Sequence, residues 1–331
     1  MRLFTSLDWV HAQGAGKVEE LSTHMAFWQA VDDGADLKKT AYADWLRGRG
    51  YSETRVWSIM EVRAMAHRGD LSPDPLPVQL NKLGHFELDD GHHRATRALY
   101  EGQPRISVEV KGVSPLWQRL VDDLESIYPE RARYLYQSIE HPYFAGWTTS
   151  RSDERLKLVR DAVSEAGITP ADGQYFEVGC CAGRFCREFS RQGFRVFGID
   201  LDKTVLAAAE HLDLIMGTSC SYWNCSVGSD RFHELWNGGD GWALTVCLSV
   251  LHSHHTMGHL DWVAEQFRLL LGRSRALITD GDAPGREYRG GTAPPEPVYY
   301  AWLQDVAGEQ WTVKRIGKTE GRMIYLLRRK S

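Results

Sequence analysis

A glycine-rich segment flanked by acidic residues is the part of the sequence best suited to hold a small molecule. Glu177 precedes Gly179 and Gly183, and Asp200 ends the next apolar run. Glycines allow a backbone to approach a ligand closely, and a carboxylate at the end of a neighbouring strand can accept hydrogen bonds from ribose hydroxyls. This arrangement predicts a site for a cofactor that contains a nucleoside.

The spacing of the glycines distinguishes between two such cofactors. The dinucleotide fingerprint Gly-x-Gly-x-x-Gly is not met, because three residues separate Gly179 from Gly183. The carboxylate of Glu177 would also repel a pyrophosphate and attract a cationic amino-acid group. The pattern therefore favours S-adenosylmethionine over NAD.

The surrounding elements alternate between strands and helices. Residues 175–178 and 194–199 have the composition of buried strands, and residues 184–192 and 202–211 that of helices. This alternation predicts a mainly parallel α/β sheet, with a third strand expected at 213–216.

The motif Glu177-x-Gly179-x-x-x-Gly183 followed by Asp200 resembles the first two motifs of class I S-adenosylmethionine-dependent methyltransferases. The resemblance covers roughly residues 151–331 and implies a Rossmann-like sheet. The expected later elements are a strand over 243–250, a helix over 260–271, a strand over 275–279, a helix over 298–306, and a closing antiparallel hairpin formed by 311–316 and 323–327.

The same resemblance implies roles for individual residues. Glu177 would face the methionine amino group, and Asp200 would hold the ribose. Gly179, Cys181 and Gly183 would line the cofactor. No acidic residue stands clearly where the adenine contact is expected, so Ser219 or Cys220 would take its place, and Ser249 completes the expected cofactor-binding set.

Histidines cluster after the predicted strand 243–250. In this fold the following loop borders the methyl-acceptor site, so His252 and then His255 are the candidate general bases. His255 and His259 could instead share a metal on one helix face. Capping or packing is the commoner explanation for clustered histidines at the start of a helix. A sulfonium is already an activated electrophile, so alignment supplies much of the acceleration and little base catalysis is needed. We expect no metal.

The polar loop 280–289 is long enough to form part of an acceptor lid, and its arginines could hold an anionic group. Exposed loop charge is the commoner explanation. The six cysteines lack the paired spacings of a zinc ribbon and are expected to be reduced thiols; a metal shared by Cys220 and Cys225 is the weaker alternative.

In the N-terminal half, Asp90, Gly91, His92, His93 and Arg94 stand at a predicted strand-to-helix turn. Imidazoles and a guanidinium beside free backbone amides suit a phosphate. Residues 77–110 resemble the ParB/sulfiredoxin-like fold, whose members bind nucleotides and include small-molecule kinases with a similar signature. The resemblance implies a nucleotide with Mg as ligand and Glu61 as a candidate acidic partner. An active phosphotransferase, a binding module and a degenerate scaffold remain open.

Length and composition set the outer limits. The chain has 331 residues, 43% of them apolar and 25% charged, as in an ordinary globular protein of two domains. With a net charge of -5, no global basic field favours nucleic acid. No apolar run approaches the roughly 20 residues that cross a bilayer, and the start lacks a signal peptide, so we expect a cytoplasmic protein without a membrane partner.

Together these features predict three parts: a smaller α+β ParB/sulfiredoxin-like domain (1–112), a helical and aromatic connector (113–150) and a class I methyltransferase domain (151–331). The predicted activity is S-adenosylmethionine-dependent methylation of a small-molecule or sugar acceptor, phosphorylated acceptors included, in glycan or natural-product biosynthesis. Two alternatives are a bifunctional protein with an N-terminal small-molecule kinase and a nucleotide-binding protein with a non-catalytic second domain. The sequence does not indicate the oligomeric state.

Overall fold

The structure, a computed structural model, describes residues 1–12, 16–17, 22–67, 74–150, 152–238, 241–288 and 291–330. The chain forms two compact units. Unit 1 comprises Met1–Val121 and Glu140–Ala145, and unit 2 comprises Asp122–Ile139 and Gly146–Ser331. The stretch expected to be a connector, 113–150, is thus divided between the two units.

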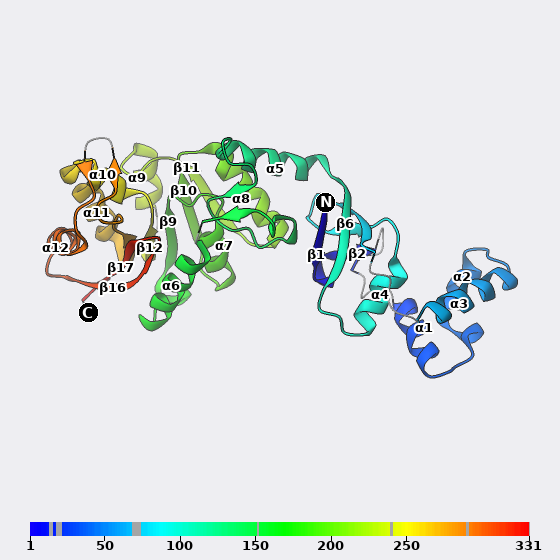
Figure 1. Cartoon of the computed structure of the whole chain (residues 1–331). Coiled ribbons are helices and arrows are strands. Elements are labelled where there is room, and N and C mark those ends of the chain that lie inside the picture. The colour runs from blue at the N-terminus through cyan, green and yellow to red at the C-terminus, as the bar shows by residue number, and fades with distance from the viewer. Residues whose placement is uncertain are drawn as a thin grey trace. The chain divides into compact units, whose positions relative to one another are not determined.

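Unit 1 contains a mixed six-stranded sheet in the order β1-β6-β4-β5-β2-β3 (Figure 1). Its strands are β1 (Arg2–Thr5), β2 (Val10–Ala12), β3 (Gly16–Lys17), β4 (Leu76–Leu80), β5 (Phe86–Leu88) and β6 (Ile106–Val113). β4 and β5 form an antiparallel hairpin, as the apolar runs 76–80 and 85–88 on either side of the turn 81–84 predict. β6 and then β1 continue the sheet beside β4, and β2 and then β3 continue it beside β5.

The helices of unit 1 are α1 (Ser22–Asp32), α2 (Ala41–Gly48), α3 (Glu53–His67), α4 (His92–Tyr100) and α5 (Pro115–Ile127), which runs on into unit 2. α1, α2 and α3 pack on one another through an apolar core that includes the fully buried Phe27, Tyr42 and Met60. The helical periodicity of residues 18–31 predicts a helix there. In the described part this helix begins at Ser22, because residues 18–21 lie outside it.

Unit 2 contains a seven-stranded sheet in the order β11-β10-β9-β12-β13-β17-β16. The strands are β9 (Gln174–Val178), β10 (Val196–Asp200), β11 (Cys220–Asn224), β12 (Trp242–Cys247), β13 (Ser274–Asp280), β16 (Trp311–Thr319) and β17 (Arg322–Arg329). The first five in this order pair in parallel, whereas β17 and β16 are antiparallel. The predicted parallel α/β sheet is confirmed.

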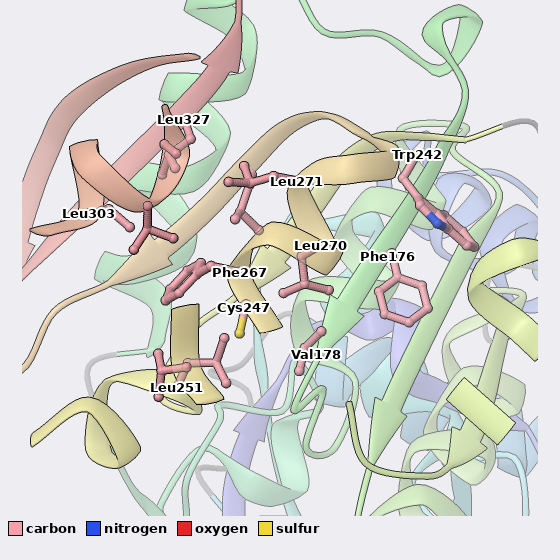
Figure 2. Packing of buried hydrophobic residues seen from close by; sticks show 14 of the residues in the cluster. Phe176, Val178, Trp242, Cys247, Leu251, Phe267, Leu270, Leu271, Leu303 and Leu327 are labelled. Atoms are coloured by element: carbon pink, nitrogen blue, oxygen red, sulfur yellow. The ribbon is translucent and has the colours of Figure 1, made fainter. Parts of the chain in front are cut away.

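Helices cover both faces of this sheet, because alternate strand residues point to opposite sides. Tyr175 packs into a core with α6 (Ser152–Glu165), α7 (Arg184–Arg191) and α8 (Lys203–Met216). Phe176 packs on the other side with α9 (Asp230–Asn237), α10 (Leu251–Thr256), α11 (Leu260–Arg273) and α12 (Glu296–Ala307), as Figure 2 shows in part. Two-residue strands complete the unit: β7 (Tyr134–Leu135), β8 (Thr148–Thr149), β14 (Glu287–Tyr288) and β15 (Gly291–Thr292).

The third strand was predicted wrongly at 213–216. These residues form the last turn of α8, where Leu212 and Ile215 are buried on the apolar face of the helix. Gly217 then ends the helix in the left-handed conformation, with φ 63°. The apolar residues of 213–216 continue the helical repeat of α8 and do not start a strand. The strand begins only at Cys220.

Among the described residues, no helix combines the length and the apolar character that a membrane span requires.

Candidate functional site

A cavity of about 690 Å³ lies at the carboxyl ends of β9, β10 and β12. In the sheet, β9 lies between β10 and β12. The chain adds β10 and β11 on one side of β9 and then β12 and β13 on the other, so the direction of winding reverses at β9. In open α/β sheets a ligand binds at such a switch point. The lining comprises Ile127, Tyr128, Tyr136, Val178, Gly179, Cys181, Ile199, Asp200, Leu201, Asp202, Val205, Cys225, Ser226, Val227, Leu248, Ser249, Val250, Leu251, Ser253, His254 and Trp262.

The glycine segment forms a tight loop on the floor of this cavity. Gly179 and Gly183 have φ 72° and 73°, and Cys181 adopts the left-handed region at φ 51°. A Cβ on Gly179 would lie 2.4 Å from Cγ2 of Val250, so only glycine fits there without movement of its neighbour. The close approach that the glycine pattern predicts is therefore present in the backbone.

Asp200 holds this loop in place from the end of β10. Its Oδ2 accepts a hydrogen bond from the Cys181 amide at 2.9 Å, and its Oδ1 accepts one from the Asp202 amide at 3.1 Å. The side chain also lines the cavity. Gly179, Cys181 and Asp200 are thus brought together as expected, and Asp200 has a second, structural task in the loop.

Glu177 lies beneath the loop and not among the residues that line the cavity. Its side chain is 4% exposed, and its Oε2 accepts hydrogen bonds from the Tyr175 hydroxyl at 3.2 Å and the Cys186 thiol at 3.0 Å. Burial raises the pKa of Glu177 to about 8. Glu177 is therefore a buried, neutral carboxyl group that supports the loop. It does not make the charged contact with a ligand that the sequence suggested.

The raised pKa of Glu177 predicts a pH-dependent stability. Below pH 4.5, its ordinary pKa, both states hold the proton; between pH 4.5 and 8 only the folded state retains it. The free energy of unfolding should therefore fall as pH rises through this window, by a few kcal/mol at about 1.4 kcal/mol per pKa unit. Urea unfolding of Glu177→Gln should lack this decline. An equal decline in the variant would assign it to other groups.

Gly183 is the N-cap residue of α7 and is not among the residues that line the cavity. A Cβ at this position would be 2.3 Å from the hydroxyl of Tyr222, which donates a hydrogen bond to Asp213 at 3.2 Å. Its role is to permit the loop geometry, without the direct ligand contact that the sequence suggested.

We expect Gly183→Ala to reduce the free energy of unfolding by about 2–5 kcal/mol. The positive φ of 73° costs about 1–2 kcal/mol for alanine, and the contact with Tyr222 adds overpacking of about 1–3 kcal/mol. Gly217→Ala is the matched control, because Gly217 has φ 63° but no atom within 4 Å of the added Cβ. Equal losses in urea unfolding would mean that Tyr222 moves aside without cost.

The far end of the cavity is formed by residues after β11. Cys225, Ser226 and Val227 line it, whereas Ser219 is exposed and Cys220 also lies outside the lining. Ser219 contacts Ser190 instead. The error in the third strand accounts for this difference. A strand at 213–216 would place Ser219 and Cys220 just after its carboxyl end, whereas β11 ends at Asn224 and is followed by Cys225.

One group of residues that line the cavity was not predicted from the sequence. Ile127, Tyr128 and Tyr136 come from the part of the presumed connector that belongs to unit 2. Burial raises the pKa of Tyr128 to about 12, so its hydroxyl remains protonated. The aromatic content of this stretch was the one signal that it packs against a neighbour.

Ser249 lies in the cavity as expected, at a strained backbone position with φ 60°. Its amide donates to Asp280 Oδ1 at 2.8 Å. Its hydroxyl accepts hydrogen bonds from Arg155 at 3.0 Å and Arg322 at 2.8 Å. A non-glycine residue held in this region by several bonds is typical of a functional site.

The two candidate bases occupy different surroundings. His252 is 5% exposed, with Nδ1 3.6 Å from Asp280 Oδ1 and Nε2 3.4 Å from Arg322 Nη1. Burial lowers its pKa. His255 packs with its ring centroid 4.8 Å from that of Tyr299 and 4.4 Å from that of Trp302, and burial lowers its pKa to about 4. His255 is not among the residues that line the cavity, and it is a packing residue.

A second, polar cavity of about 300 Å³ adjoins the first, since Tyr136, Ser249 and Ser253 line both. Its other lining residues are Tyr134, Ser150, His252, Arg286, Glu320 and Arg322. Arg286 comes from the loop expected to form a lid, and Arg289 of that loop lies outside the described residues. In the described ranges no group of three or more His, Cys, Asp or Glu side chains could hold a metal ion.

Unit 1 has a separate cavity of about 650 Å³ at the start of α4. Asp90, Gly91, His92, His93 and Arg94 all line it, together with His24, Tyr42, Trp45, Leu46, Arg49, Tyr51, Ile59 and Arg63. Burial lowers the pKa of Arg63 to about 10, and its Nη1 has no hydrogen-bond partner in the described part of the chain. Glu61 is exposed and not part of the lining.

Comparison with known proteins matches part of unit 2. Residues 176–225 match the family described as a methyltransferase domain, a segment that runs from β9 to the end of β11. No curated protein matches the chain.

Among solved structures, one of WbdD is similar with a TM-score of 0.50 and 20% identity, over 64% of this chain and 41% of that one. Another, described as the bifunctional kinase-methyltransferase WbdD, has a TM-score of 0.48 and 20% identity over 62% and 46%. Magnesium protoporphyrin IX methyltransferase from Synechocystis PCC 6803 with bound SAM has a TM-score of 0.41 and 17% identity over 55% and 82%. The chain spans less than half the length of these WbdD chains. At 20% identity the likeness with a TM-score of 0.50 is one of fold alone. The parallel strands of unit 2, with helices on both faces, form a Rossmann-like sheet.

Proposed function

We propose that unit 2 is an S-adenosylmethionine-dependent methyltransferase. The observation that carries this proposal is the cavity at the switch point, in which the glycine loop and Asp200 meet within the segment that matches the methyltransferase domain family. A glycine turn alone occurs in many α/β proteins. The loop, the carboxylate and the open space in front of them together are what a nucleoside-containing cofactor requires.

The residues present fit this cofactor in two respects. Asp200 offers carboxylate oxygens toward the ribose while it anchors the Cys181 amide. Leu201, Val205 and Val227 supply apolar surface for a flat base beyond it. S-adenosylmethionine, when bound, supplies a methyl group on a sulfonium centre. The chain's own contribution is to align an acceptor and exclude water, and Tyr128 and Tyr136 are among the residues that enclose the cavity.

The acceptor that we propose is a small molecule or a sugar, in glycan or natural-product biosynthesis, and the protein is proposed to work in the cytoplasm. The polar cavity beside the cofactor cavity supports a small acceptor. The six free cysteines support a reducing compartment.

Turnover with methyl-labelled S-adenosylmethionine over a panel of hydroxylated acceptors tests the activity. Calorimetry with S-adenosylmethionine and its demethylated product tests the cofactor separately. Binding of both compounds together with labelled product supports the proposal. Binding without turnover of any acceptor would favour a protein that uses the cofactor only as a ligand, and no binding would refute the proposal.

A second candidate function concerns unit 1, whose cavity favours a phosphorylated ligand. Arg49, Arg63 and Arg94 face it with Asp90 as the one carboxylate of its lining. Burial lowers the pKa of His24 to about 4 and of His93 to about 2, so these imidazoles are neutral donors or acceptors at pH 7. We propose a nucleotide as the ligand, with Mg as a component to be tested, and a kinase as the activity if turnover follows.

Titration with ATP, ADP and CTP, with and without Mg²⁺, tests this candidate. Arg63→Met should weaken nucleotide binding at least tenfold, because a charged hydrogen bond contributes about 1.5–3 kcal/mol. Arg55→Met is the matched control, since Arg55 is an exposed residue of the same helix. Absence of binding by the unaltered protein would leave unit 1 as a scaffold.

A further inference from the structure

We propose that the polar cavity beside the cofactor cavity is the acceptor site and that it selects an uncharged, hydroxyl-bearing acceptor over an anionic one. This inference rests on the proposed methyltransferase function and narrows its substrate class. Its basis is the way in which charges around the cavity compensate one another.

The position of the polar cavity suits an acceptor. Tyr136, Ser249 and Ser253 line both cavities, so a molecule held in the smaller one borders the space assigned to the cofactor. The strained backbone of Ser249 lies at this boundary and is fixed by Asp280, Arg155 and Arg322. The network therefore fixes Ser249 at the place where the two cavities share lining residues.

Each guanidinium around the polar cavity already faces a carboxylate. Arg322 Nη1 lies 3.1 Å from Asp280 Oδ2, and Arg322 Nη2 lies 3.3 Å from Glu320 Oε2. Arg155 contacts the same Glu320 oxygen at 2.8 Å.

The third guanidinium, that of Arg286, lies 3.8 Å from Asp282. Three cations thus meet three anions in the described surroundings of the cavity. Burial lowers the pKa of His252, which therefore adds no positive charge near neutral pH.

This balance disfavours an anionic acceptor. A phosphate or carboxylate would have to compete with Glu320, Asp280 and Asp282 for guanidinium groups that are already paired, and it would lose its own hydration on entry. A cavity made for an anion would instead present guanidinium groups that do not face a carboxylate of the protein.

The same balance suits hydroxyl groups. A hydroxyl both donates and accepts, so it can accept from Arg322 or Arg286 and donate to Glu320 without separating the ion pairs. Tyr134 and Tyr136 add ring surface, and the serines add further donors and acceptors. A polyhydroxylated ring such as a neutral glycoside presents this pattern on all its edges.

Glu320 is the residue that tests the inference most directly. Glu320→Gln removes the carboxylate that Arg155 contacts and leaves Arg322 with Asp280 as its remaining carboxylate. The variant should therefore gain affinity for anions and lose affinity for neutral polyols. Glu165→Gln is the matched control, because Glu165 forms an exposed ion pair with Lys314 elsewhere in unit 2.

The probes are methyl α-D-glucopyranoside and glucose 6-phosphate, each followed by saturation-transfer NMR on the full chain with and without the demethylated cofactor. We expect the unaltered protein and Glu165→Gln to bind the glycoside at least tenfold more tightly than the phosphate ester, and Glu320→Gln to reverse or abolish this preference. Unfolding midpoints of the three proteins establish that each is folded.

Three results would overturn the inference: tighter binding of the phosphate ester by the unaltered protein, binding of neither probe, or an unchanged preference in Glu320→Gln. Calorimetry with S-adenosylmethionine separates this failure from that of the proposed function. If the cofactor binds while the glycoside does not, the acceptor class is wrong and the cofactor assignment stands. If the glycoside binds while the cofactor does not, the reverse holds.

Discussion

Asp200→Ala is expected to weaken S-adenosylmethionine binding by roughly 100-fold or more, because two hydrogen bonds to a charged group contribute about 1.5–3 kcal/mol each. The loss has two sources. The ribose would lose its carboxylate partner, and the amides of Cys181 and Asp202 would lose their acceptors at 2.9 and 3.1 Å. The loop that forms the cavity floor would then be less well ordered. Calorimetry with the cofactor measures the effect.

Two further variants divide these contributions. Asp200→Asn retains one oxygen that can accept from Cys181, so its affinity should lie between those of the unaltered protein and the alanine variant. Asp161→Ala removes an exposed carboxylate that pairs with Lys157 on α6 and should leave affinity unchanged. Full affinity in Asp200→Ala would show that the ribose is held elsewhere and would remove the main support for the cofactor site.

Phe176→Ala is expected to lower the free energy of unfolding of unit 2 by about 3–5 kcal/mol, the usual loss for a buried aromatic side chain. Phe176 is fully buried in β9 (Figure 2). Its ring centroid lies 5.9 Å from that of Phe232, 5.0 Å from Trp236 and 4.8 Å from Trp242. These rings belong to α9 and β12, so the cavity left behind would loosen the contact of three elements.

Urea unfolding followed by tryptophan fluorescence measures this loss, since two of the neighbouring rings are indoles. Leu214→Ala is the control: Leu214 is 62% exposed on α8, and its replacement should change the free energy by no more than about 0.5 kcal/mol. Similar losses in both variants would mean that the aromatic cluster contributes little beyond an ordinary surface contact.

Several features of the site could be predicted because they depend on short stretches of chain. Gly179 and Gly183 are required where the backbone adopts positive φ, and this requirement is visible in residue type alone. Asp200 ends an apolar run, and a strand of that length delivers its last residue to the carboxyl edge of a parallel sheet. The parallel α/β architecture followed from the same alternation of elements.

Other features depended on contacts between distant segments. Glu177 belongs to the predicted strand, but its depth beneath the loop depends on Tyr175 and Cys186 packing around it. Ser219 does not line the cavity, because α8 continues to Met216 and the third strand starts later than predicted. Burial of the apolar face of α8 extends the helix beyond the end that local composition indicates. Local composition does not contain the packing energy that decides such boundaries.

The sequence by itself determined the glycine loop, the acidic end of β10 and the order of strands and helices, since each arises from backbone geometry or from periodicity within a few residues. Only the tertiary structure decided that Tyr128 and Tyr136 wall the cavity, that His255 is a packing residue, and that Arg155, Asp280 and Arg322 converge on Ser249. These groups lie far apart along the chain. Their meeting depends on which sheet edges and helix faces bury one another, and that choice minimises the free energy of the whole fold and not of any single segment.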